Sequence, residues 1–250
     1  MPPPSPVSIP FELQGAPVHG FRGNAPDGPL THPRGLTVAI SRQAGSRGTE
    51  IAKKVADILT WQVFDHDTLD YLVQNDDARA QLLADVPADA RAWADAQLEH
   101  LQRDHKLNAD PEVLPLIRLV LTVAARGNAV IVGRAAGFLL PPETTVHVRV
   151  IAPTEARVAY LAQELRLTRP EAAEEVRARD ERRALFLDRT LARDPADPTA
   201  YDAVVNAERL GVEGAAQFIG WAVRTKQMFA EIAESGPPSP FTDLDELAGV

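Results

Sequence analysis

The feature that most constrains the fold is a strand-like run, a loop of small residues and a helical pattern, which follow one another directly at residues 36–59. The run Leu36-Thr37-Val38-Ala39-Ile40 is rich in β-branched and aliphatic residues and predicts a strand. A loop rich in Gly, Ser and Arg follows, and the segment from Thr49 to Leu59 then carries apolar residues at helical spacing, namely Ile51, Val55, Ile58 and Leu59. The sequence therefore predicts a strand–loop–helix unit here.

The same alternation continues to the end of the folded part. Four more short apolar runs predict strands at 61–64, 128–132, 145–151 and 203–205. Helical patterns separate them, at 68–126, after Pro153 and after Thr168, where Glu171 completes a capping box. Strands that alternate with helices predict an α/β fold with a five-stranded parallel sheet flanked by helices, in which ligands bind outside the carboxyl ends of the strands.

The loop after the first strand has the properties of a phosphate site. Glycines let backbone N–H groups converge on an anion, and the helix that follows points the positive end of its dipole at the same place. The Thr49 hydroxyl lies where it can reach a magnesium ion that a nucleotide carries. Spacing alone leaves open that this is a plain strand-to-helix loop of small residues.

Composition excludes some classes of protein. A formal net charge of −9 argues against a protein whose main task is to grip nucleic acid, although a local basic patch is compatible with it. The chain has no cysteine, hence no disulfide or thiolate site, and no apolar run of the roughly 18 residues that a membrane span needs. The histidines show no ligand spacing, so no transition-metal site is expected. We expect a cytoplasmic protein with no membrane partner.

The ends of the chain differ from its middle. Residues 1–35 are rich in Pro and Gly, lack hydrophobic periodicity and predict a disordered leader. Residues 233–250 include a second Pro-rich stretch and predict a flexible acidic tail. One domain is expected between them, at 36–232.

Several motifs resemble a known family. The segment Ile40-Ser41-Arg42-Gln43-Ala44-Gly45-Ser46-Arg47-Gly48-Thr49 is similar to the phosphate loop of bacterial cytidylate kinase, and more closely to the cytidylate-kinase-like family, whose loop reads Ser-Arg-Gln-x-Gly-Ser-x-Gly. Val132-Gly133-Arg134, Arg179-Asp180-Glu181-Arg182 and Tyr201-Asp202-Ala203-Val204-Val205-Asn206 match later family motifs in the same order. The resemblance implies the P-loop kinase fold of nucleoside monophosphate kinases, with a helical acceptor-binding insertion and an arginine-rich lid.

The resemblance also implies site residues in the loop. Its backbone is expected to bind the phosphates of ATP through Gln43, Ala44, Gly45, Ser46, Arg47, Gly48 and Thr49, with Thr49 supporting Mg²⁺. The loop lacks the usual lysine: aligned without gaps, Gly48 stands at the lysine position and Arg42 at the first loop glycine. If the loop is one residue shorter, Arg47 takes the lysine's place and becomes a catalytic cation.

Further candidates bind the acceptor or close the lid. Arg134 follows a strand and a glycine and is expected to bind the acceptor phosphate, the alternative being a surface arginine. Asp67 is expected near the acceptor or its Mg²⁺, the alternative being a helix cap. Three arginines three and four residues apart share one helical face and are expected to close over the transferred phosphoryl group: Arg179, Arg182 and Arg183. The alternative for them is a solvated face paired with neighbouring acids.

The expected activity is transfer of the ATP γ-phosphoryl group, with Mg²⁺, to a nucleoside monophosphate such as CMP. The family pattern has an Asp after the strand-end Arg, but Ala135 stands there in this sequence, which removes that acid's contacts. Two alternatives stay open: a nucleotide-sensing pseudokinase, suggested by the missing lysine, and a kinase that acts on a small molecule other than a nucleotide. Acceptor identity, loop competence and oligomeric state do not follow from the sequence.

Overall fold

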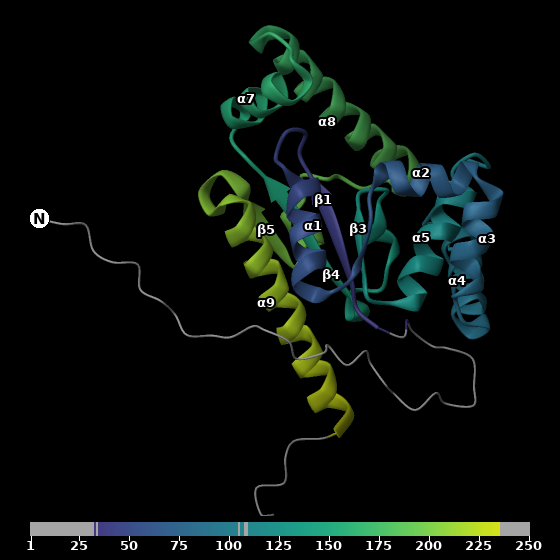
Figure 1. The fold of residues 1–250 in the computed structure, drawn as a ribbon. Helices are drawn as coiled ribbons and strands as arrows, with labels where there is room; N and C mark the ends of the chain where they lie inside the picture. The colour runs from purple at the N-terminus through teal and green to yellow at the C-terminus, as the bar shows by residue number, and fades with distance from the viewer. Residues whose placement is uncertain (1–32, 34, 105, 108–109, 236–250) are drawn as a thin grey trace, which may run out of the picture.

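The computed structural model describes residues 33, 35–104, 106–107 and 110–235 (Figure 1). Its strands are β1 (Thr37–Arg42), β2 (Gln62–Phe64), β3 (Ala129–Val132), β4 (Thr145–Ile151) and β5 (Ala203–Asn206). Its α-helices are α1 (Gly48–Leu59), α2 (His66–Gln74), α3 (Asp76–Ala84), α4 (Ala88–Arg103), α5 (Leu114–Arg126), α6 (Ala136–Leu139), α7 (Thr154–Leu165), α8 (Arg169–Leu191) and α9 (Ala207–Ser235). Short 3₁₀ helices η1 (Pro142–Thr144) and η2 (Pro198–Ala200) precede β4 and β5.

The strands form one parallel five-stranded sheet in the order β2-β3-β1-β4-β5. The predicted fold class is thereby confirmed, and each predicted strand is present. β1 continues two residues beyond the predicted Ile40, because Ser41 and Arg42 still pair with Arg149 and Val150 of β4. The chain passes from β1 to β2 and β3 on one side of β1 and then crosses to β4 and β5 on its other side, and such a switch point opens a crevice at the carboxyl ends.

Two apolar cores cover the two faces of the sheet. Alternate residues of the central strands, such as Val38 and Ile40, pack with α1 and α9 on one face. Ala39 and Ile131 point the other way and pack with α5, α6 and α4. The central strands β1, β3 and β4 are therefore largely buried on both sides, which explains why they appear in the sequence as nearly continuous apolar runs rather than alternating ones.

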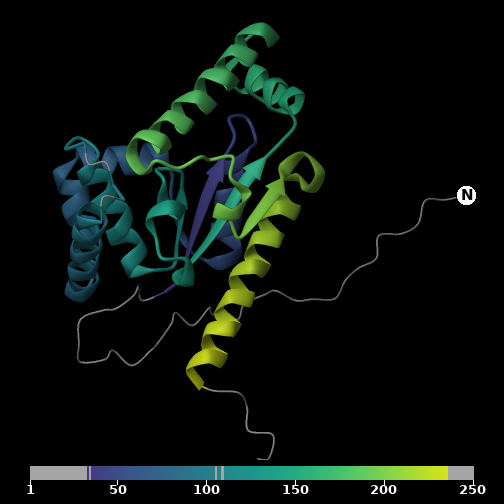
Figure 2. The same ribbon diagram turned by 180° about the vertical axis from the view of Figure 1, so that it is seen from behind.

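The predicted helical region at 68–126 forms α2 to α5 at one side of the sheet (Figure 2). Asp65 caps the first of these helices, since its carboxylate accepts hydrogen bonds from the Thr68 N–H and hydroxyl at 3.0 and 2.8 Å. The cap considered for Asp67 is therefore made by Asp65 instead.

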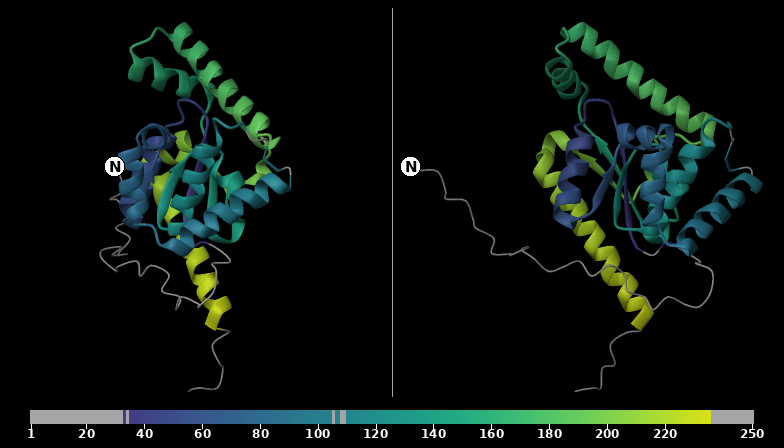
Figure 3. Two further views of the ribbon diagram at one scale, coloured as in Figure 1. Left: turned by 90° about the vertical axis from the view of Figure 1, so that its right-hand side faces the viewer. Right: turned by 45° about the vertical axis from the view of Figure 1, so that its right-hand side comes forward.

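Helices α7 and α8 form a hairpin above the carboxyl ends of the strands, and α8 spans from α7 to the side of α2 (Figures 1 and 3). The predicted capping box is present at Thr168 and Glu171. The hairpin has a small core of its own, in which Val158, Leu161 and Val176 surround the methyl group of Ala44 from the β1–α1 loop. The α7–α8 hairpin is thus packed directly onto that loop.

The predicted leader and tail lie almost entirely outside the described residues, and their boundaries stay predictions. Helix α9 runs to Ser235 and contains a kink at Gly211, where φ is +69°. Among the described helices, no segment is both long and apolar enough to cross a bilayer.

Candidate functional site

A cleft of about 750 Å³ lies at the carboxyl ends of the strands, beneath α8. The ends of β1, β3 and β4, the start of α2 and one face of α8 form its walls. Arginines dominate its polar lining: Arg42, Arg134, Arg149, Arg179, Arg182 and Arg183. The acidic side chains that line it are Asp65, Asp67 and Glu175. The cleft therefore has an excess of positive charge, on a chain whose net charge is −9.

The β1–α1 loop is held in shape by its own side chains. The buried Ser46 hydroxyl donates to the carbonyl oxygens of Gln43 and Val150 at 2.9 and 3.3 Å. The Gln43 side-chain oxygen accepts from the Ala152 N–H at 3.2 Å. Gly45 has φ +75°, and a Cβ there would stand 2.5 Å from the carbonyl oxygen of Arg157. The side chains of Gln43 and Ser46 thus serve the loop's structure, and the backbone N–H groups of the same two residues are also bound within the fold, to the carbonyl oxygens of Val150 and Gln43 at 3.0 and 3.3 Å.

The amino end of α1 opens at the same place. Its first N–H groups have no intrahelical acceptor, as at any helix start, and the dipole there favours an anion. Thr49 in this first turn lines the cleft. The structure thus brings the loop, the helix start and Thr49 together at one edge of the cleft.

Arg47 points away from the cleft. Its side chain is 47% exposed and pairs with Glu50 at 2.7 Å, and its guanidinium carbon lies 5.8 Å from the ring centre of Tyr160. The hydrogen bond to Glu50 raises the pKa of Arg47. The geometry does not support Arg47 in the position of the missing lysine.

Arg42 points into the cleft, whereas Arg47 is exposed outside it, and the sequence did not single out Arg42 as a site residue. Its side chain crosses Gly48, and its guanidinium lies against Gly133 at the end of β3. Burial and the nearby charges of Arg183 and Arg134 together lower the pKa of Arg42 to about 9. The only signal in the sequence was an arginine two residues after the end of the first predicted strand.

Arg134 enters the cleft from the turn after β3, where its backbone has φ +52°. Its guanidinium contacts Asp70 and His66, both on α2. Asp67 lines the cleft on the same wall. The structure therefore brings Arg134 and Asp67 together at the side of the helical segment, opposite the loop.

The three predicted lid arginines all line the cleft from α8. Arg179 pairs with Glu175 at 2.6 Å, and Arg182 lies 3.7 Å from the same carboxylate. Arg183 donates to the Arg42 carbonyl oxygen at 3.3 Å, and burial lowers its pKa. The arginines on this side of α8 are thus partly paired with acidic residues of the same helix, as the alternative above expected, and they also line the cleft.

Asp180 joins the α7–α8 hairpin to the loop. Its carboxylate accepts from the Ala44 N–H at 2.7 Å and pairs with Arg157 at 2.6 Å. Arg157 is itself buried and also donates to the Ala44 carbonyl oxygen at 3.2 Å. One of the backbone N–H groups expected to bind phosphate is therefore occupied by a carboxylate of the protein.

A buried histidine fixes the end of β1. His147 Nδ1 donates to the Ala200 carbonyl oxygen at 2.8 Å, so Nε2 accepts from the Ser41 hydroxyl at 3.0 Å. Burial lowers the pKa of His147 to about 4, so the ring is neutral near pH 7. The pair orients Ser41 directly beside Arg42.

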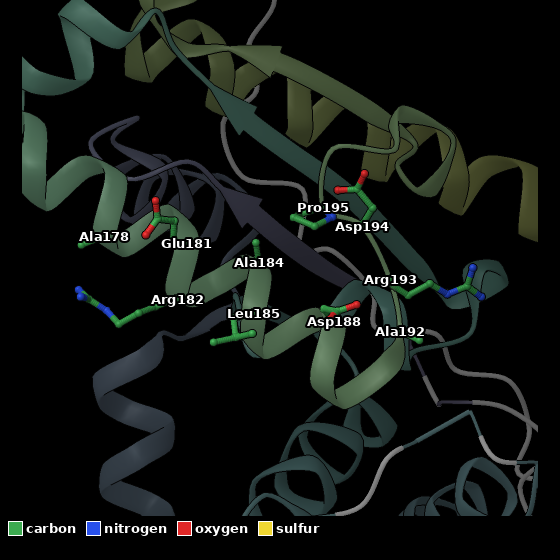
Figure 4. Close-up of a pocket in the computed structure, with 10 residues that line it drawn as sticks. All are labelled: Ala178, Glu181, Arg182, Ala184, Leu185, Asp188, Ala192, Arg193, Asp194 and Pro195. Carbon is green, nitrogen blue, oxygen red and sulfur yellow. The ribbon is translucent and has the colours of Figure 1, made fainter.

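A second hollow of about 860 Å³ lies on the outer side of α8 (Figure 4). Arg182 and Pro195 line both this hollow and the cleft. Figure 4 shows Arg182 on α8 and Arg193 beyond the helix end, with their guanidinium groups pointing in opposite directions. Arg182 thus stands at the rim between the two spaces.

The comparisons with known proteins agree with this geometry. The model of the cytidylate kinase-like family matches residues 37–209. The chain belongs to the cytidylate kinase-like family. A cytidylate kinase from Ignicoccus hospitalis is 33% identical over 111 residues, which are 44% of this chain and 64% of that relative. The match therefore spans just under two thirds of the relative's length.

Solved structures show how widely this family's fold is shared. An uncharacterised protein from Eubacterium ventriosum superposes with a TM-score of 0.53 at 16% identity, over 76% of this chain and 98% of that one. A shikimate kinase from Bacteroides thetaiotaomicron matches with a TM-score of only 0.40 at 15% identity, over 76% and 98% of the two chains, too weak to support an argument. These likenesses concern the fold alone.

The cleft of this cytidylate kinase-like protein suits a polyphosphate with Mg²⁺. Arginines present forked donors that match phosphate oxygens. Mg²⁺ is usually bound by one or two protein oxygens together with substrate phosphates, and the Thr49 hydroxyl and the carboxylates of Asp65 and Asp67 line the same space. Hydrogen bonds from Thr68 outweigh the opposing effect of burial and lower the pKa of Asp65, which is therefore ionised near pH 7.

Proposed function

We propose that this protein is a phosphotransferase that moves the γ-phosphoryl group of ATP to a nucleoside monophosphate. The observation that carries the proposal is the arginine-lined cleft, which opens between the β1–α1 loop on one side and Arg134 with α2 on the other. Two anionic substrates have room to meet there, with α8 above them. Family membership supports the coarse class, a nucleotide kinase.

In this proposal the two walls bind different substrates. The loop backbone from Gln43 to Thr49 binds the phosphates of ATP, and Thr49 holds a magnesium ion that screens their charge. Arg134 binds the phosphate of the acceptor, with Asp67 beside it. The lid arginines Arg179, Arg182 and Arg183 neutralise the phosphoryl group during transfer and exclude water.

The reaction needs little covalent chemistry from the protein. An oxygen of the acceptor phosphate forms a bond to the γ-phosphorus, the bond from that phosphorus to the β–γ bridging oxygen breaks, and ADP leaves with the electron pair. Catalysis of this kind consists of positioning and charge neutralisation. The cleft offers both, because Arg134 is held by α2 while Arg183 is held against the carbonyl oxygen of Arg42.

CMP is the acceptor that we propose first, since the matched relative is a cytidylate kinase. Ala135 follows Arg134 in the cleft wall, where the apolar methyl group offers no hydrogen bond to a base or sugar. The test therefore uses a panel. Purified protein receives Mg·ATP with CMP, dCMP, UMP, AMP, GMP, small sugars and carboxylic acids, and ADP formation is followed. Turnover with none of the monophosphates contradicts the proposal, and turnover with a sugar or acid selects the alternative kinase.

Arg134→Ala tests the acceptor side. Loss of a charge-assisted hydrogen bond is expected to raise the KM of the acceptor by about 10- to 100-fold, with a smaller effect on the KM of ATP. Arg126→Ala, at the exposed end of α5, is the matched control and should leave both constants unchanged. An unchanged acceptor KM in Arg134→Ala removes this residue from the site.

A nucleotide-sensing pseudokinase is the second candidate. It is favoured by the loop's lack of a lysine and by Asp180, which occupies the Ala44 N–H. Calorimetry with Mg·ATP separates the two, because binding without turnover on the whole panel selects the pseudokinase.

A further inference from the structure

We propose that Arg42, the last residue of β1, supplies the cation that contacts the phosphate chain in the cleft, in place of the lysine that the loop lacks. The inference deepens the proposed function and rests on the same cleft. It assigns a binding role to a residue outside the loop proper. It also excludes Arg47 from that role.

Two glycines form the slot in which Arg42 lies. A Cβ on Gly48 would stand 2.7 Å from the Cβ of Arg42, and one on Gly133 would overlap its Nη1. Gly48 starts α1 and Gly133 directly follows β3, so the aliphatic part of the side chain lies against the amino end of a helix and the guanidinium lies against the turn after β3. The charge is therefore held at the carboxyl edge of the sheet, one side-chain length from the helix end whose dipole favours an anion.

The charge of Arg42 has no direct counter-ion. Among the described residues, no carboxylate lies within 4.0 Å of its guanidinium. The charges with the largest effect on Arg42 are those of Arg183 and Arg134, which repel it, and the smaller effects of Asp65 and Asp67 attract it. An unpaired cation that is partly withdrawn from water costs folding free energy. Such a group in a cleft wall is typical of a site that waits for an anionic ligand.

A purely structural arginine would look different. Arg157 illustrates that case, since its buried guanidinium pairs with Asp180 at 2.6 Å and donates to a carbonyl oxygen. Arg47 is also satisfied, by Glu50 at 2.7 Å on the exposed side of the loop. Arg42 is partly buried, has no such partner in the described chain, and lines the cleft.

The test measures anion binding apart from turnover. Inorganic pyrophosphate is titrated into wild type, Arg42→Gln and Arg47→Gln, and heat is recorded by calorimetry. Loss of charge-assisted hydrogen bonds should weaken the dissociation constant by about 10- to 100-fold in Arg42→Gln. Arg47→Gln should stay within about threefold of wild type. Urea unfolding of each variant gives a second measurement, in which Arg42→Gln should be at least as stable as wild type because it removes an unpaired, partly buried charge.

Each outcome of these measurements either supports or overturns the inference about Arg42. Equal pyrophosphate binding by Arg42→Gln, a larger loss in Arg47→Gln, or no binding by wild type overturns the inference. A marked loss of stability in Arg42→Gln also overturns it, because that result is expected of a structural arginine. If wild type binds pyrophosphate through Arg42 but turns over no nucleotide, the proposed function fails and the inference stands.

Discussion

Replacement of Gly133 by Ala should disable the cleft without changing any residue that carries charge. Gly133 has φ +79°, and a Cβ there would overlap the Nη1 atom of Arg42. Alanine in this backbone conformation costs about 1–3 kcal/mol. For a domain of this size, such a loss lowers Tm by about 2–12 °C. The methyl group also pushes the Arg42 guanidinium out of its slot, which should lower kcat/KM by about 10- to 100-fold.

Gly127 provides the matched control at the other end of β3. It has φ +76°, and a Cβ there would stand 2.7 Å from the backbone of Gly35, far from the cleft. Gly127→Ala should therefore lose a similar amount of stability and keep its activity within about threefold. Urea unfolding and steady-state kinetics, both well below Tm, measure the two effects separately.

A double variant tests the route of the effect. If Gly133→Ala lowers activity by displacing the Arg42 guanidinium, the double variant Gly133→Ala/Arg42→Gln should be about as active as Arg42→Gln alone, because the guanidinium is already absent. Equal activities for Gly133→Ala and Gly127→Ala, or full additivity in the double variant, would refute the reasoning.

Two further predictions concern the supports of the cleft. The pKa of His147 is about 4 in the folded state and 6.5 in the unfolded state, so the folded state binds fewer protons between these values. The contribution of His147 to the free energy of unfolding is therefore fully present above pH 6.5 and falls by about 3 kcal/mol as the pH drops toward 4. Urea unfolding against pH should show this slope in wild type and in His100→Gln, whose ring is exposed, but a flatter one in His147→Gln. Asp180→Asn, which breaks the pair with buried Arg157, should lower stability by about 1–3 kcal/mol and speed hydrogen exchange at 43–47. Asp188→Asn on the same helix should do neither, and equal exchange in both variants would show that Asp180 does not hold the loop.

Local patterns were sufficient to predict the sheet. The central strands are short apolar runs because both faces of the sheet are covered there, and most of the runs are bounded by polar or glycine residues. The Thr168 capping box could also be predicted, and so could the shared helical face of Arg179, Arg182 and Arg183, because the residues concerned lie three or four positions apart on one helix. The family motifs supplied the order of these parts.

Contacts between segments far apart in the sequence could not be predicted from local patterns. Asp180 meets the Ala44 N–H across 136 residues, and nothing near either residue indicates the contact. The helix cap was assigned to Asp67 as an alternative, but Asp65 makes it, because one residue decides where a helix begins. Arg42 was missed for a similar reason, since its slot is made by two glycines far apart in the sequence, one at the start of α1 and one just after β3.

The contact between loop and lid changes what closure of this cleft involves. Ala44 belongs to the small core of the α7–α8 hairpin, and its N–H binds Asp180 of α8. A phosphate oxygen that takes this N–H has to displace a carboxylate, so one anion replaces another on the same donor. The displaced Asp180 has Arg183 within 3.8 Å, an arginine that already contacts the backbone of Arg42. We therefore expect anion binding at the loop and the position of Arg183 to be linked through the side chain of Asp180.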